Sequence, residues 1–403
     1  MKIVLATFGS RGDVQPMLAL SLALKRAGHD ALLVAPPEKA DWAAELGCPF
    51  YPIGGDVTSF IDSMKDAYSI GSVFKFMGFL RKEIPSQFDI LTGIIAGADL
   101  VIGSSLMFFL SSAAELLSIK YCYVAFVPQL FPSGHHPFFA FKRQGLPGWY
   151  NRMTWHIALV LDRFNLTGLI NKKRVQVGLK PVRDAWFHIL GPRVILACDR
   201  PIAWPPSDIL PAVIQTGYMH LEQPEQENPE LEEFLNSGPP PVYAGFGSMP
   251  KRDQAGCVPL IVHSARSAGR RVVIAKFWDK PSGFSGSDDV FFLNKYPHLR
   301  LFPRMAAVIH HGGAGTTASS AASGVPQIIV PHALDQYYWG HKVYTTRLGP
   351  KPIWRSRLTS ERLTAAIQEC LSNSRIRQKA LATSKMIDPK TSLETTVREV
   401  ERF

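Results

Sequence analysis

The first fifty residues contain blocks of apolar positions that predict strands and helices in turn. Residues 3–8 form a continuous apolar run, which is typical of a strand buried in a parallel sheet. Residues 15–27 carry apolar side chains at helical spacing and are followed by Gly28, a residue type that often ends helices. The next elements repeat this order, with a strand over 30–35, a helix over 41–46 and a strand over 50–53. This βαβαβ opening predicts a doubly wound α/β domain.

A second series of alternating strands and helices begins at residue 242. Its predicted strands span 242–246, 271–275, 290–293, 307–309 and 327–330, and its predicted helices span 255–268, 315–323, 338–347 and 359–372. The first series continues with strands over 100–103 and 121–126, a last strand over 194–198 and a short strand after it over 213–217. A chain of 403 residues is too long for a single core. We therefore predict an N-terminal domain over 1–221, a Pro- and Glu-rich linker over 222–241, a second domain over 242–384 and a polar helical tail over 385–403.

Composition narrows the range of partners and compartments. The net charge of +11 favours anionic partners such as a nucleotide, but no Lys/Arg run is interleaved with aromatic residues as in nucleic-acid binders. We therefore expect no nucleic-acid partner. The five cysteines are scattered without a C-x-x-C pair, which is typical of buried free thiols in a reducing compartment. No signal-peptide pattern precedes the first strand and no apolar run reaches the ~20 residues that span a bilayer, so we expect a cytoplasmic protein.

The strongest chemical signal is the stretch HHGGAGTT over residues 310–317. It follows a buried-strand pattern and opens a helix of small residues, an order in which α/β proteins hold phosphate. Glycines let backbone N–H groups approach an anion, the helix N-terminus adds roughly half a positive charge, and the leading histidine adds a donor. A second signal is the pair Asp335 and Gln336, which follows the next strand. A carboxylate beside an amide suits the hydroxyl groups of a sugar at this end of a sheet.

These segments together resemble the family-1 glycosyltransferases. The resemblance is to the branch that holds sterol glucosyltransferases and the vancomycin-group antibiotic glycosyltransferases. Besides residues 310–336, the segments that carry it are GSRGDVQP over 9–16, PVYAGFGSM over 241–249 and LFPR over 301–304. They occur in the family's order and separations, so the resemblance covers nearly the whole chain. It implies the GT-B fold, in which two doubly wound domains face each other across a cleft, and a tail that packs back on the N-terminal domain.

The resemblance also implies roles for individual residues. Asp13, in the loop after the first strand, is expected to be the base that deprotonates the acceptor hydroxyl, although it can instead cap the following helix. The residues expected to bind the donor diphosphate are Ser10, Ser248, His310, Gly312, Gly313, Ala314, Gly315 and Thr316. Asp335 and Gln336 are expected to bind the donor sugar, and Trp278, Pro297 and His298 the nucleobase. His311 is expected to pack rather than to bind.

No metal or other cofactor is expected at this site. Fixed donors at the diphosphate take the place that a divalent cation has in other transferases. The pair Asp288-Asp289 is the sequence's nearest approach to a D-x-D metal motif, and we interpret it as a solvated turn. The reaction implied is an inverting transfer of a hexose, glucose from UDP-glucose, with dTDP as the alternative nucleotide.

Two segments, 55–95 and 130–190, fit the alternation poorly and are rich in Phe, Trp, Met and His. We interpret them as insertions that form the acceptor pocket, which favours a lipophilic acceptor such as a sterol, terpenoid or polyketide. Two other interpretations stay open: packing of long loops onto the core, and peripheral contact with a membrane. The second rests on the basic residues among the aromatic ones, Lys75, Arg81, Lys82, Lys142 and Arg143.

Other functions on this architecture are less consistent with the sequence. A sugar-nucleotide epimerase needs no large acceptor pocket. A nicotinamide-dependent oxidoreductase needs a G-x-G-x-x-G loop and an acidic residue after the second strand, where residues 35–37 read APP. A sugar-nucleotide-binding protein without catalytic activity needs neither Asp13 nor the pair Asp335 and Gln336, and sequence alone leaves it open. Oligomeric state is not predicted.

Overall fold

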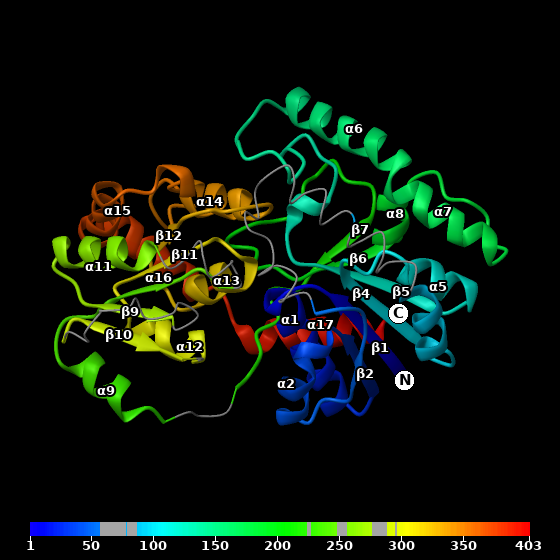
Figure 1. Ribbon diagram of the computed structural model, residues 1–403, viewed down its shortest axis with the longest axis horizontal. Coiled ribbons are helices and arrows are strands. Elements are labelled where there is room, and N and C mark those ends of the chain that lie inside the picture. The colour runs from blue at the N-terminus through cyan, green and yellow to red at the C-terminus, as the bar shows by residue number, and fades with distance from the viewer. Residues whose placement is uncertain (57–77, 79–86, 224–226, 248–255, 276–287, 295) are drawn as a thin grey trace.

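Two parallel sheets make up the computed structural model of the protein (Figure 1). The structure describes residues 1–56, 78, 87–223, 227–247, 256–275, 288–294 and 296–403. Within these, the N-terminal sheet has the strand order β3-β2-β1-β4-β5-β6-β7 and the C-terminal sheet has the order β10-β9-β8-β11-β12. The strand pairs of both sheets are parallel. The predicted α/β class with two doubly wound domains is confirmed.

The strands follow the apolar runs closely. In the N-terminal sheet they are β1 (Lys2–Phe8), β2 (Asp30–Ala35), β3 (Phe50–Pro52), β4 (Leu100–Ser105), β5 (Lys120–Ala125), β6 (Arg193–Leu196) and β7 (Ala212–Gln215). In the C-terminal sheet they are β8 (Val242–Gly245), β9 (Val272–Ala275), β10 (Val290–Leu293), β11 (Ala307–His310) and β12 (Gln327–Ile329). One prediction needs correction, because β7 pairs with β6 and so ends the first sheet in place of the strand near 194–198.

Helices lie between the strands of each domain. Those of the first domain are α1 (Arg11–Arg26), α2 (Ala40–Glu45), α5 (Leu110–Leu116), α6 (Gly148–Phe164), α7 (Leu166–Gln176) and α8 (Ala185–Leu190). Those that follow are α9 (Pro229–Asn236), α11 (Cys257–Ser267), α12 (His298–Leu301), α13 (Ala314–Ala322), α14 (Gln336–Thr345), α15 (Ser360–Ser372), α16 (Ser374–Ser384) and α17 (Pro389–Glu401). Much of segment 130–190 is therefore helical. Helix α9 lies inside the predicted linker, and its buried leucines pack with residues of the second sheet.

Side-chain alternation along β1 divides the first core between the two faces of the sheet. Ile3 and Leu5 face the cluster under α1, whereas Val4 and Ala6 face the cluster on the opposite side. That second cluster continues into the C-terminal domain through buried residues of α13 and α14, so apolar contacts join the two domains. The five cysteines are all buried and free, as predicted.

The last helix returns to the N-terminal domain. Asp388 caps α17 by accepting a hydrogen bond from the backbone N–H of Lys390, and Pro389 occupies the first helical position. Leu393, Val397 and Val400, at helical spacing, are buried in the same cluster as α1. In Figure 1 this red helix accordingly lies among the blue elements of the first domain. No helix among the described residues has the length and apolar character needed to cross a membrane.

Candidate active site

Both sheets place their predicted site loops where the strand order reverses. In the first sheet the chain proceeds outward from β1 in one direction and from β4 in the other, so the crevice between these strands opens at their carboxyl ends. Asp13 follows β1, and Ser105 ends β4 directly beside Phe8 of β1. In the second sheet the reversal lies between β8 and β11, and the glycine-rich turn follows β11. Open α/β sheets bind ligands at such points, at the carboxyl ends of the strands where the strand order reverses.

Asp13 caps the start of α1, one of the two roles that the sequence left open, and its role as a base stays a prediction. It is the third residue of α1, and its Oδ2 accepts hydrogen bonds from the backbone N–H of Ser10 at 2.7 Å and from the Ser10 hydroxyl at 3.1 Å. Its Oδ1 accepts a hydrogen bond from the Ser105 hydroxyl at 2.7 Å. Removal from water raises the pKa of Asp13, against the opposing effect of these bonds. One carboxylate oxygen therefore holds the helix start, while the other faces β4.

The Ser105–Asp13 contact depends on an uncommon backbone conformation. Ser105 has a φ of 54°, in the left-handed region that few non-glycine residues adopt. Such strain persists where surrounding structure imposes it, and it often occurs at functional sites. Ser105 was not among the predicted site residues, although its place at the carboxyl end of a central strand was a usable signal.

Ser10 is turned away from its predicted role. Its hydroxyl donates to Asp13 Oδ2, and its backbone N–H donates to the same oxygen. Because both of these donors are engaged within the first turn of α1, Ser10 has none left to offer a diphosphate in this conformation. The expected diphosphate contact of Ser10 is therefore replaced by a helix-capping role.

His310 is likewise a structural residue rather than a free donor, which corrects the prediction. Its side chain has no solvent exposure; its Nε2 lies 3.1 Å from Gln327 Oε1, and its Nδ1 lies 3.2 Å from the backbone N–H of Gly312. The imidazole must accept from Gly312 and donate to Gln327, so both ring nitrogens are occupied. Burial lowers the pKa of His310 to about 3, which keeps the ring neutral.

The adjacent His311 has the geometry that was predicted for His310. A Cβ on Gly313 would come within 2.5 Å of His311 Nε2, and one on Gly247 within 2.8 Å of its Cε1, so the ring lies between the two loops. Its Nδ1 is buried without a hydrogen-bond partner in the part of the chain that the structure describes. Burial lowers the pKa of His311 to about 4, so the ring is neutral with one N–H to donate.

The turn after β11 presents the N-terminus of α13. Gly313 is the N-cap residue and supplies no side-chain cap, and the N–H groups of Ala314, Gly315 and Thr316 belong to the first turn, where helices lack internal acceptors. Gly312 precedes the cap with a φ of 92°. A Cβ on Gly312 would lie 2.8 Å from Ile329 Cγ2 and 3.0 Å from the Gln336 carbonyl oxygen. Backbone donors and the positive end of the helix dipole therefore lie together at this turn, an arrangement that favours an anion.

Gly312→Ala is expected to destabilise the protein by about 2–4 kcal/mol, because a side chain at this φ is strained and also meets backbone. Urea unfolding of the purified chain measures the free-energy change. Gly93→Ala is the matched control, since Gly93 lies in helical backbone with no atom within 4 Å of an added Cβ. Equal midpoints for the two variants would contradict the geometry assigned to Gly312.

Asp335 and Gln336, which were both predicted to bind the donor sugar, have different surroundings in the structure. The Gln336 Oε1 accepts hydrogen bonds from the backbone N–H groups of His332, at 2.7 Å, and Ala333, at 3.0 Å, so this oxygen orders its own loop. Asp335 is the N-cap residue of α14. Burial and then the charge of Asp13 raise the pKa of Asp335 to about 7. The charge of Asp13, in the first domain, thus acts on the carboxyl group of Asp335 in the second.

Two of the residues predicted to bind the nucleobase, Pro297 and His298, lie at the start of α12. Pro297 precedes α12, and the His298 ring stacks on Phe302 at 4.4 Å between centroids. Burial lowers the pKa of His298 to about 3, with smaller contributions from the nearby charges of Arg11, His220 and His311. Trp278 and Ser248 lie outside the described residues.

One residue of the site has no local sequence signal. Tyr218 follows β7 in the first domain, and a Cβ on Gly315 would come within 2.6 Å of its hydroxyl oxygen. Its backbone N–H donates to Asp199 Oδ1 at 3.0 Å, which holds the loop. The Tyr218 hydroxyl therefore meets the first turn of α13 from the opposite domain, beside the expected diphosphate position.

Acidic residues outside the site form ordinary contacts. Asp288 and Asp289 lie in a turn, as predicted, with Asp288 exposed and Asp289 half-buried, and Asp289 accepts hydrogen bonds from Arg266 Nε at 2.5 Å and Nη2 at 2.9 Å. Among the described residues, no cluster of three or more His, Cys, Asp or Glu side chains could hold a metal ion.

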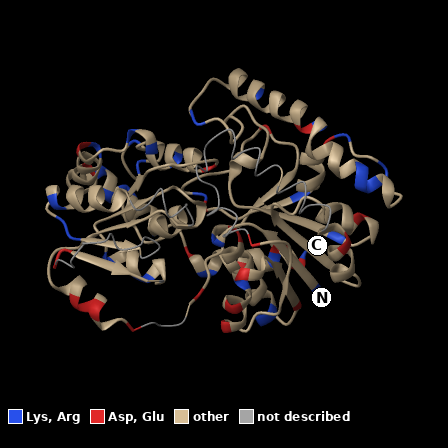
Figure 2. Cartoon of the chain, viewed as in Figure 1, with Lys and Arg blue, Asp and Glu red and all other residues tan. Residues whose placement is uncertain are grey.

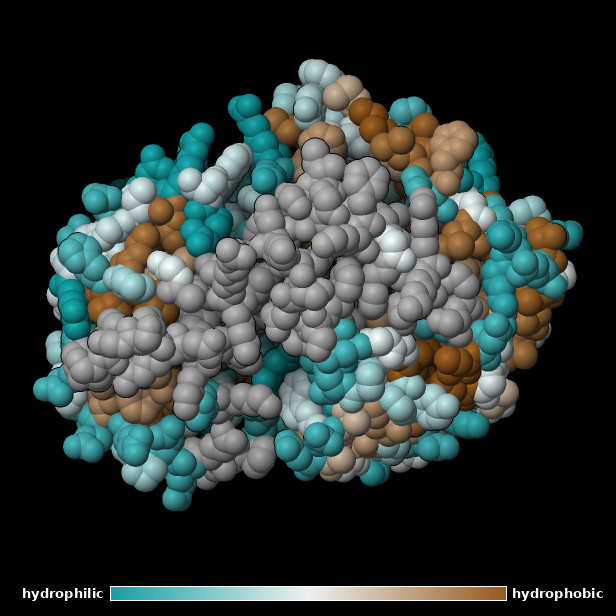
Figure 3. Space-filling view, in the orientation of Figure 1, coloured by the Kyte–Doolittle hydropathy of each residue, from teal (hydrophilic) through white to brown (hydrophobic). Residues whose placement is uncertain are grey.

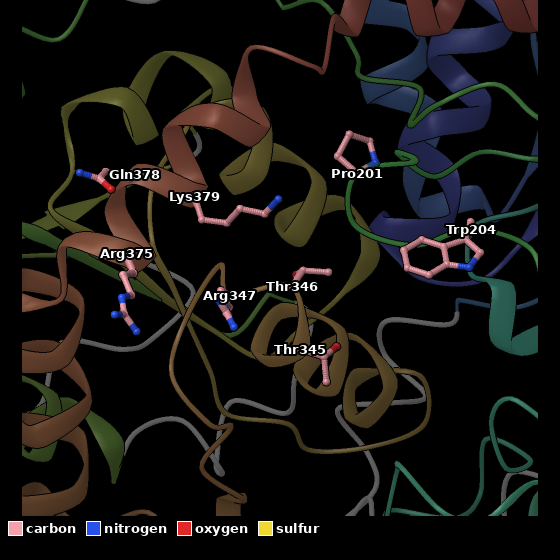
Figure 4. A pocket seen from close by; sticks show the side chains of 8 residues that line it. All are labelled: Pro201, Trp204, Thr345, Thr346, Arg347, Arg375, Gln378 and Lys379. Atoms are coloured by element: carbon pink, nitrogen blue, oxygen red, sulfur yellow. The ribbon is translucent and has the colours of Figure 1, made fainter.

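A separate open pocket of about 690 Å³ lies at another part of the domain boundary (Figure 4). Pro201 and Trp204 of the first domain face the end of α14 and one side of α16 there. Its lining is Pro201, Trp204, Thr345, Thr346, Arg347, Arg375, Gln378 and Lys379. None of these is a predicted site residue.

Comparison with known proteins agrees with this geometry. A model of the glycosyltransferase family 28 N-terminal domain matches residues 3–133, and a model of the erythromycin biosynthesis protein CIII-like C-terminal domain matches residues 266–398. Fold, site and these matches define the chain as a glycosyltransferase.

Relatives that match most of this chain identify the family. The vancomycin aglycone glucosyltransferase of Amycolatopsis orientalis is 34% identical over 360 residues, covering 87% of this chain and 85% of its own. The sterol 3-beta-glucosyltransferase UGT80A2 of Arabidopsis thaliana is 29% identical over 412 residues, covering 93% of this chain and 61% of its own. The chain belongs to the family-1 glycosyltransferases, in the branch of the vancomycin-group and sterol enzymes.

Solved structures agree on the fold. The glycosyltransferase VinC, in complex with dTDP, superposes with a TM-score of 0.69 at 19% identity, with complete coverage of both chains. The glycotransferase of kitacinnamycin superposes with a TM-score of 0.74 at 17% identity, covering 99% of this chain and 98% of its own. The expected GT-B fold is confirmed.

Proposed function

We propose that this glycosyltransferase moves glucose from UDP-glucose to a hydroxyl group of a lipophilic acceptor, with inversion at the anomeric carbon. The observations that carry the proposal are the position of Asp13 after the carboxyl end of β1 and the contact of Tyr218, from the same domain, with Gly315 in the first turn of α13. Asp13 is hydrogen bonded at the switch point of the first sheet, and the charge on Asp13 reaches both Asp335 and Tyr218 of the cleft.

The proposed step is a single displacement. Asp13 accepts the proton of the acceptor hydroxyl, whose oxygen forms a bond to the anomeric carbon while the bond from that carbon to the diphosphate oxygen breaks. The electron pair stays on the leaving diphosphate. His311 and the first N–H groups of α13 stabilise this developing charge without rearrangement, because they are already oriented. One displacement converts an α-linked donor into a β-glycoside.

Asp335 is proposed to hold the sugar. Its pKa, raised to about 7 by burial and by the charge of Asp13, lets the carboxyl group exist in either protonation state near neutral pH. It can therefore accept from one sugar hydroxyl or donate to another. Gln336 is proposed to act through the loop that its side chain orders.

The lipophilic acceptor is proposed from the aromatic cluster of the first domain. Phe138 packs edge-on against Trp155 at 5.1 Å, and Phe139 stacks on Trp186 at 5.8 Å. Trp186 donates its indole N–H to the Leu130 carbonyl oxygen, which leaves its ring as an apolar wall. Two relatives act, by name, on a vancomycin aglycone and on sterols, which supports an apolar polycyclic acceptor without choosing one.

Transfer without a metal and location in the cytoplasm are part of the proposal. Preoriented donors at His311 and α13 supply the charge stabilisation that a cation would otherwise provide. The five buried free cysteines support a reducing compartment.

Calorimetric titration of the purified chain with UDP-glucose, dTDP-glucose and UDP-N-acetylglucosamine tests the donor. We expect UDP-glucose to bind with micromolar affinity, unchanged by Mg²⁺ or EDTA, and to be hydrolysed slowly without acceptor. Preference for dTDP-glucose would overturn the UDP assignment, and binding that requires Mg²⁺ would overturn the metal-free mechanism. The absence of binding by all three sugars would overturn the donor site.

A further inference from the structure

Helix α6 exposes a continuous apolar face to solvent. The side chains of Trp149 and Phe164 are 67% and 83% exposed, and four more large apolar side chains between them are also exposed. The full set is Trp149, Met153, Ile157, Val160, Leu161 and Phe164. At about 100° per residue, these six positions fall within a single arc of about 120°. Soluble proteins rarely expose such a run unless it has a partner.

Basic residues border this arc along one edge. Arg152, His156 and Arg163 are exposed and fall within about 40° of one another on the helix, next to Trp149. Arg152 also lies 3.4 Å from Asp208, whereas no ion pair of Arg163 occurs among the described residues. Lys172 is exposed on the adjoining helix α7. Figure 2 shows Lys and Arg on both helices, and in Figure 3 brown atoms gather along the upper edge over α6.

The opposite face of α6 is well packed, so the exposed arc is not a poorly folded segment. Asn151, Thr154 and Trp155 are buried, and the indole N–H of Trp155 donates to the His136 carbonyl oxygen at 3.1 Å. Trp155 in turn contacts Phe138 and Trp186 of the aromatic cluster. Helix α6 is therefore the single layer of structure between the aromatic cluster and solvent on this side.

We propose that the outer face of α6 docks this protein on an anionic membrane surface, with the helix lying in the interface plane. An apolar arc bordered by basic side chains, with tryptophan and phenylalanine at its ends, is the pattern of interfacial helices. The basic edge complements anionic headgroups, and the net charge of +11 adds long-range attraction. Docking in this orientation holds the aromatic cluster directly behind the membrane contact. The proposal does not depend on the identity of the donor or the acceptor.

Sedimentation of the full-length chain with sucrose-loaded vesicles tests the proposal. We expect the wild type to pellet with phosphatidylcholine vesicles that contain phosphatidylglycerol, more weakly with phosphatidylcholine alone, and more weakly at high salt. Leu161→Ser with Phe164→Ser is expected to lower the partition coefficient at least about tenfold, since two apolar side chains no longer enter the interface. Arg163→Glu is expected to weaken binding to the anionic vesicles selectively.

The controls remove equally exposed groups elsewhere. Leu210→Ser with Leu381→Ser takes away side chains that are 83% and 56% exposed but lie off α6, and Lys351→Glu makes the same charge change away from it. Wild-type protein that stays in the supernatant with both vesicle types would overturn the proposal, as would equal losses in the α6 and control variants. A dimer in sedimentation velocity that the α6 double variant abolishes, without vesicle binding, would assign the face to a second copy instead. UDP-glucose titration of the same variants is expected to be unchanged, which separates this proposal from the donor site.

Discussion

Asp13→Asn is expected to lower kcat by about 10²–10⁴-fold while leaving donor binding intact. The asparagine side chain keeps an oxygen that can accept from the Ser10 backbone N–H, and its amide can donate to the Ser105 hydroxyl. Helix α1 therefore keeps its cap, and only the ability to take a proton is lost. Product formation with a sterol or polyketide acceptor, together with calorimetric binding of UDP-glucose, measures the two properties separately.

The pH dependence distinguishes a base from a structural cap. A base acts deprotonated, and removal from water raises the pKa of Asp13, so wild-type kcat/KM should rise with pH along a limb above the ordinary carboxyl value of about 4. Asp13→Asn should abolish this limb. Without the charge of Asp13, the inflection of Asp335 should move below its value of about 7. A fall in activity of less than about tenfold, with the limb retained, would show that Asp13 only caps the helix.

His311→Ala is expected to lower kcat by about 10²–10³-fold, the cost of removing one preoriented donor from a site of developing charge. The ring lies over Gly247 and Gly313 and has no structural hydrogen bond at Nδ1 among the described residues, so its loss should change the unfolding midpoint little. Steady-state kinetics with UDP-glucose and thermal unfolding measure the two effects. His311→Gln, which restores an N–H donor, should recover part of the rate.

The neighbouring histidine provides the contrast. His310→Ala removes a side chain with no exposure and leaves Gln327 and Gly312 without their partners, so it should destabilise the fold by about 2–4 kcal/mol. If His310→Ala instead lost activity at unchanged stability, and His311→Ala behaved as wild type, the original assignment of the diphosphate donor to His310 would be restored.

Local patterns predicted the elements of the site well. Continuous apolar runs located β1, β8 and β11, because strands buried on both faces leave no polar positions. Glycine-rich turns after two of them, and the pair of polar residues after β12, predicted which end of each sheet holds the ligand. The segment 130–190 was harder, because the helices α6, α7 and α8 do not alternate with strands.

Other features depend on contacts between distant residues. Ser105 reaches Asp13 only because β4 pairs with β1, although the two residues are 92 positions apart in the sequence. Tyr218 meets Gly315 only because the two domains close on one another. No spacing or motif in the sequence indicates either of these two contacts. The capping role of Asp13 likewise becomes clear only from the hydrogen bonds that its two carboxylate oxygens accept.

By itself, the sequence determined the order of strands and helices, the two-domain α/β class and the loops that form the site, because hydrophobic period and turn residues act locally. The tertiary structure decided which side chains in those loops pack into the core and which lie between the loops. Successive residues at the end of a strand point to opposite faces of the sheet, so His310 enters the core beside Gln327 while His311 enters the site. Which face is core and which is cleft depends on how the sheets are covered, and no local pattern in residues 310–317 contains that information.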